Sequence, residues 1–93
     1  MDLPNFDEFQ QKALAAGYDE VIEREWAPNT VLDTHAHPFG VHALLTQGEM
    51  WLTMNGQTQH LVPGSIFELK PDLPHAERYG AEGATYWVAR KNA

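Results

Sequence analysis

Three histidines are the residues of this chain whose type and spacing could do chemistry. His35 and His37 lie two positions apart, and His75 follows thirty-eight residues after His37, behind Leu73-Pro74. Side chains two apart on a strand point to the same face, so His35 and His37 can present two imidazoles together. His75 can join them if the strands pair in a barrel. Because imidazole suits Zn, Cu, Fe and Ni, the pattern predicts a metal site.

The segments that must position these histidines are mostly short strands. A capping-box pair, Asn5 and Glu8, with apolar residues at helical spacing and a stop at Gly17, predicts one helix over residues 6–16. From residue 18 onward, short alternating runs are separated by turn signals such as Asn55-Gly56. The predicted strands cover residues 18–26, 31–37, 43–47, 49–54, 57–62, 65–69, 75–79 and 84–90. Such spacing is typical of an all-β sandwich or barrel, here over residues 18–90.

Composition limits the classes of function. The 93 residues predict one domain over residues 1–93, and 43% hydrophobic residues are too many for a disordered chain. The absence of cysteine excludes disulfides, thiolate ligands and a cysteine nucleophile. A net charge of −7 repels phosphate backbones, so we expect no nucleic-acid binding. We also expect no membrane association and a cytoplasmic location, since the sequence has no long apolar run and no signal-peptide pattern.

The spacing around the histidines resembles the two motifs of the cupin superfamily of small, RmlC-like jelly rolls. The first cupin motif is G(X)5HXH(X)3,4E(X)6G. Here Asn29 replaces its first glycine, His35 and His37 form the HXH pair, and Gly48 closes the motif. Asparagine tolerates positive φ, so the first replacement is mild.

The second cupin motif, G(X)5PXG(X)2H(X)3N, begins at Gly64. Lys70 stands for its proline, Asp72 for its second glycine and Tyr79 for its asparagine, while His75 is retained. The resemblance implies an all-β fold, a double-stranded β-helix or jelly-roll barrel with a short N-terminal α-helix.

One ligand of the usual cupin set is missing from the first motif. Counts from His37 and from Gly48 both place Val41 at the position of the glutamate. The next residue, His42, is a possible fourth ligand, but alternation turns it outward if Val41 faces in. A bulge after Gly40 would turn His42 inward, so both alternatives stay open.

Other polar residues share strand faces with the histidines. The parity of His75 puts Glu77 on its face, as a carboxylate that orients an imidazole, as an acid of the site, or as a rim residue facing water. Asp33 shares the parity of His35 and has the same alternatives. His60 lies outside both motifs, and we expect it to be exposed. An outward Trp51 would indicate a subunit interface, and we expect a homodimer.

The cupin resemblance implies a small-molecule ligand and a divalent transition metal such as Fe, Mn, Ni or Zn. A three-histidine site without carboxylate resembles the Fe(II) thiol dioxygenases, so one expectation is a metal-dependent oxygenase acting on a small, anionic molecule. The alternatives are a non-catalytic binding or sensing cupin and a sugar or keto-acid isomerase. The lack of a fused output domain favours an enzyme at this point. The sequence does not identify any catalytic residue.

Overall fold

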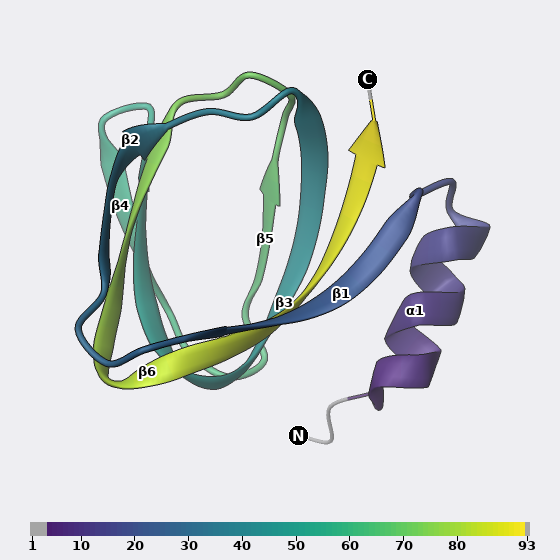
Figure 1. The fold of residues 1–93 in the computed structure, drawn as a ribbon, viewed down its shortest axis with the longest axis horizontal. Coiled ribbons are helices and arrows are strands. Elements are labelled where there is room, and N and C mark those ends of the chain that lie inside the picture. Colours follow the sequence, from purple (N-terminus) through teal and green to yellow (C-terminus); the bar gives the residue numbers. More distant parts are fainter. Residues whose placement is uncertain (1–3, 93) are drawn as a thin grey trace.

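The computed structural model describes residues 4–92 as one helix followed by six strands (Figure 1). Their bounds are α1 Phe6–Ala15, β1 Glu20–Trp26, β2 Val31–His35, β3 Phe39–Met54, β4 Gln57–Leu61, β5 Ile66–Leu69 and β6 His75–Asn92. The predicted all-β fold with a short N-terminal helix is confirmed. The helix ends one residue earlier than predicted, and its capping box forms, since the Glu8 amide donates to Asn5 Oδ1 at 2.8 Å.

Two long strands, β3 and β6, replace four of the predicted short ones. They pair antiparallel from Phe39 opposite Asn92 to Met54 opposite His75. The expected break at Gly48 is an irregularity within this pairing, with register shifts on both sides of that glycine. Gly48 has φ +77°, and a Cβ there would meet the Gly83 carbonyl oxygen, so no other residue fits this crossing of the strands.

The strands close into a barrel around one apolar core. Strand order is β1-β6-β3-β4, with β2 also paired to β6 and β5 to β3 (Figure 1). Buried and exposed positions alternate regularly along β5, where Phe67 and Leu69 are buried and Ile66 and Glu68 are exposed. The core is formed by Val41, Ala43, Leu45, Met50, Leu52, Leu61, Phe67, Leu69, Tyr79, Ala84, Tyr86 and Val88.

Helix α1 packs on the outside of the barrel, beside β1 (Figure 1). Its buried residues, Phe9 and Ala13, form a second apolar cluster with outward side chains of the strands, Val21, Leu44 and Ala89. The apolar stripe predicted for the helix is therefore accounted for by this packing. No helix within residues 4–92 has the length and apolar character that a membrane crossing requires.

Candidate metal centre

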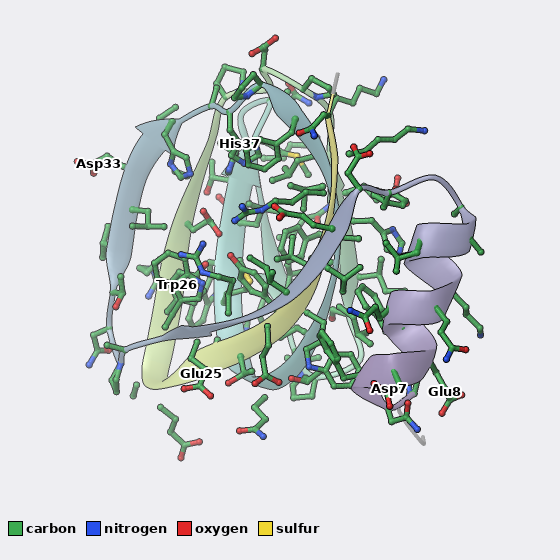
Figure 2. All side chains as sticks on the ribbon, turned by 45° about the vertical axis from the view of Figure 1, so that its right-hand side comes forward. Asp7, Glu8, Glu25, Trp26, Asp33 and His37 are labelled. Carbon is green, nitrogen blue, oxygen red and sulfur yellow. The ribbon has the colours of Figure 1, made fainter. Side chains whose placement is uncertain are left out.

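The pairing of β2 with β6 brings the predicted histidines together. His35 lies directly opposite His75 in the register of the two strands, and their ring centroids are 4.4 Å apart. The His37 ring lies 4.9 Å from that of His75 and 6.2 Å from that of His35. In Figure 2, His37 lies under the segment that leads from β2 to β3. The three imidazoles therefore converge from two segments far apart in the sequence.

Each of the three imidazoles is oriented by a backbone carbonyl two residues away. The contacts are His35 Nδ1 to Asp33 O at 2.7 Å, His75 Nδ1 to Leu73 O at 2.9 Å, and His37 Nδ1 to Phe39 O at 3.2 Å. Since a carbonyl oxygen only accepts, each Nδ1 must carry the hydrogen in these bonds. Each Nε2 then has a free lone pair, the arrangement that metal-binding histidines use.

Glu77 supplies a carboxylate to the same group. Its Oε2 lies 3.4 Å from His35 Nε2 and 3.9 Å from His75 Nε2. These two imidazoles and Glu77 each offer a ligand atom, and the three atoms lie within 4.8 Å of one another. Metal bonds of about 2.0–2.2 Å place neighbouring ligand atoms roughly 3 Å apart. The donor types and the separations therefore fit a divalent transition metal.

The presence of Glu77 corrects two expectations. Its side chain is only 7% exposed, so the alternative of a rim residue facing water is wrong. The site is also not free of carboxylate, because β6 supplies the acid that Val41 does not supply from the first motif. The signal was the His75-Ala76-Glu77 spacing, which puts both side chains on one strand face.

Tyr79 holds the carboxylate in place. Its hydroxyl donates to Glu77 Oε1 at 2.6 Å, and the Tyr79 residue is 1% exposed. Burial raises the pKa of Tyr79 far above its ordinary value, so the hydroxyl keeps its proton and remains a donor. With Oε1 engaged in this way, Oε2 is directed to the histidines.

His37 lies at the edge of the histidine group. Its ring stacks on that of Phe39, with centroids 4.2 Å apart and planes 6° apart. Burial lowers the pKa of His37, and the neighbouring His75 and His35 lower it further. The ring is therefore neutral at pH 7, which is the form that binds a metal.

The structure does not bring His42 to this group. Val41 points into the core, and His42 points outward, where its Nδ1 lies 3.0 Å from Glu68 Oε1. Its ring lies 6.0 Å from those of Phe9 and Tyr18, in the contact between helix and barrel. No bulge follows Gly40 in the pairing of β3, so alternation decides the direction of His42.

A bulge does occur on β2, and it decides among the alternatives for Asp33 in favour of a residue facing water. Leu32 pairs with Glu77 and His35 with His75, so β2 has one extra residue between these pairs. Asp33 is therefore exposed, and Figure 2 shows it pointing away from the barrel. Only its carbonyl serves the site. His60 is exposed, as expected.

Two residues of the inner wall were not singled out from the sequence. Trp26 stacks on Tyr79, with ring centroids 5.1 Å apart and planes 15° apart. The guanidinium carbon of Arg24 lies 4.7 Å from the centroid of the Trp26 ring. The alternation of Ile22, Arg24 and Trp26 along β1 was the available signal.

A double-stranded β-helix whose HXH pair and later histidine converge on its inner wall defines a cupin. Residues 17–90 match the family model described as the AraC-like ligand binding domain. This chain therefore belongs to that family.

Individual relatives share the domain within longer proteins. A 42-residue stretch, 45% of this chain, is 43% identical to an uncharacterized HTH-type transcriptional regulator of Haemophilus influenzae, of which it covers 14%. An RmlC-like cupin from Shewanella frigidimarina is similar in structure, with a TM-score of 0.72, 17% identity, and coverage of 83% of this chain and 68% of that one. An HTH_3 family transcriptional regulator from Vibrio cholerae has a TM-score of 0.68, 18% identity, and coverage of 85% and 46%. The structural matches establish the fold alone.

Proposed function

We propose that this chain is a metal-dependent small-molecule-binding domain that serves a transcriptional regulator. His35, His37, His75 and Glu77 would hold a divalent transition metal, with Fe, Mn, Ni or Zn suited to nitrogen and oxygen donors. The observation that carries the proposal is that ligand atoms of His35, His75 and the buried Glu77 lie within 4.8 Å of one another, with the His37 ring 4.9 Å from that of His75. When bound, the metal would supply a positive charge and free positions for ligand oxygen atoms.

The residues of the chain divide the work of the site. The carbonyl bonds hold the imidazoles in one tautomer, so none of the three must change its tautomer before it binds a cation. Glu77 adds one negative charge, and Tyr79 fixes its direction. His35 is 39% exposed, so the group can be reached from solvent. These features support recognition of a small molecule beside the metal.

The choice of sensing over catalysis rests on the family match. The matched family is one of ligand-binding domains, and a relative with 43% identity over the aligned stretch is a transcriptional regulator. An oxygenase is the second candidate, because three histidines and one carboxylate leave two positions of a six-coordinate metal for other ligands. We still predict that this chain does not itself bind nucleic acid.

Metal analysis of the purified protein without an affinity tag tests the proposal. We expect about one transition metal per chain in the wild type and a loss of stoichiometric metal in His75→Ala and His37→Ala. His42→Ala is the matched control, because it removes an imidazole from the outer face only. Full metal content in His75→Ala, or metal loss in His42→Ala equal to that in His75→Ala, would contradict the assignment.

We also propose that the chain forms a homodimer through the outer face of the barrel. On that face Trp51 lies between the His60 ring, 4.7 Å from its centroid, and the Arg78 guanidinium, 4.1 Å away. Val31, which pairs with Arg78, is 62% exposed. Tryptophan and arginine are enriched at interfaces. Light scattering at tens of micromolar should give a dimer, and Trp51→Ala should shift it to monomer.

A further inference from the structure

Arg24, on the inner wall of the barrel, makes no ion pair and no hydrogen bond through its side chain within residues 4–92. Along β1, Val21 packs against the helix cluster, whereas Ile22 and Trp26 pack against the barrel core. Arg24 lies between Ile22 and Trp26 in this alternation, so it is on the inner face. Figure 2 shows Trp26 inside the barrel and Glu25 pointing away from it. Arg24 is half-buried, so a ligand can reach it.

The donors of this wall lack acceptors. Within residues 4–92, Arg24 makes no ion pair, while Arg90 donates to Glu20 Oε1 at 3.2 Å. Trp26 Nε1 is buried and has no hydrogen-bond partner among the same residues. Buried donors are normally satisfied, and a guanidinium carries five donors. The buried Trp26 Nε1 and the guanidinium of Arg24, which has no ion pair, lie side by side, an arrangement suited to an acceptor that is not part of this chain.

A continuous line of contacts joins Arg24 to the candidate metal centre. Arg24 lies over Trp26, and Trp26 stacks on Tyr79. Tyr79 donates to Glu77, whose other oxygen faces His35. These residues form one side of the barrel interior. Arg24 is therefore linked to the candidate ligands through the side chains of Trp26, Tyr79 and Glu77.

We propose that Arg24 binds the carboxylate of a small organic acid whose other oxygen atoms face the metal centre. The inference rests on the proposed function for the metal end of the ligand. A guanidinium is planar and matches a carboxylate in a two-point contact. A divalent metal on three neutral imidazoles and Glu77 keeps a net positive charge, to which Arg24 adds another. The single charge of one guanidinium matches a carboxylate better than a phosphate, which carries nearly two negative charges.

Calorimetric titration of the zinc-loaded protein with pyruvate, 2-oxoglutarate, oxalate and neutral pyruvamide tests this inference. We expect at least one of the three acids to bind. If that acid is pyruvate, neutral pyruvamide should bind at least tenfold more weakly than pyruvate. Arg24→Gln should weaken the acid at least tenfold, and Arg24→Lys should restore only part, because lysine keeps the charge without the two-point contact. The control is Lys12→Gln, which removes one positive charge from helix α1 on the outside of the barrel.

Metal content and circular dichroism of each variant separate this inference from the proposed function. Arg24→Gln should keep metal and fold. If the wild type binds no metal, Arg24-dependent acid binding to the metal-free protein would still support the role of Arg24. Acid binding that is unchanged in a folded, metal-loaded Arg24→Gln protein would overturn the inference. So would a wild-type protein that binds none of the three acids at millimolar concentration, or a Lys12→Gln variant that loses as much affinity.

Discussion

The Tyr79 hydroxyl donates to Glu77 Oε1 at 2.6 Å, and both side chains are buried in the barrel wall. This bond leaves Glu77 Oε2 beside His35 Nε2. A carboxylate that faces cationic or metal partners on one oxygen and a fixed donor on the other is held in one direction. The carboxylate of the candidate centre therefore depends on a tyrosine that contacts none of the three histidines through an ion pair or hydrogen bond.

Removal of the hydroxyl at residue 79 should weaken the metal centre without removing a ligand. Partners that orient metal ligands are typically worth about 10–100-fold in metal affinity, and we expect a loss of this size in Tyr79→Phe. The measurement is a metal titration against a competing chelator. Tyr18→Phe is the control, because Tyr18 packs in the apolar cluster beneath helix α1, outside the barrel interior. Equal affinity in wild type and Tyr79→Phe would show that Glu77 needs no orienting donor.

The convergence of the histidines could be predicted because it follows from strand parity and motif spacing. His35 and His75 lie opposite each other, and alternation alone directs Val41 inward and His42 outward. Glu77 could be placed on the face of His75, but its burial could not. That burial depends on the pairing of β6 with β2 and β3 together, which only the closed barrel defines.

The features that could not be predicted are local irregularities and long-range contacts. The extra residue in β2 turns Asp33 outward, and no turn residue in the sequence marks it. Gly48 was expected to separate two strands, yet the pairing with β6 continues past it. Arg24 was missed because its charge on a strand reads as a solvent-facing residue. Its direction is clear only once Trp26 is seen to pack on Tyr79.

Acid should weaken both metal binding and the metal-free fold through His37. Its pKa is lowered from the ordinary 6.5 in the folded protein, mainly by burial, so the unfolded chain binds the proton more readily. The stabilising contribution of the neutral ring is therefore complete above pH 6.5 and is lost as pH falls through the folded pKa. Urea unfolding of the metal-free protein at several pH values between 8 and 4.5 should show this, and His37→Gln should show a smaller dependence. An identical dependence in His37→Gln would contradict the role of His37.

Removal of the metal should leave the barrel folded. The apolar core is built from hydrophobic side chains of the six strands, and His75 and Glu77 are buried beside it without being part of that apolar cluster. A bound metal then stabilises the protein only by mass action, about 2.7 kcal/mol at a free concentration one hundred times its Kd. Far-ultraviolet circular dichroism before and after chelation should show the same β spectrum, with a lower unfolding temperature after chelation. Loss of the β spectrum would identify the metal as structural.

The crossing of β3 and β6 at Gly48 should be intolerant of any side chain. Gly48 and Gly56 have nearly the same positive φ, +77° and +75°, so alanine would be strained at both. A Cβ at Gly48 would meet the Gly83 backbone, whereas one at Gly56 would have nothing within 4 Å. We expect Gly56→Ala to lower the free energy of unfolding by about 1 kcal/mol and Gly48→Ala by about 3 kcal/mol or more. Urea unfolding of both variants checks this, and equal losses would mean that the two strands move apart at little cost.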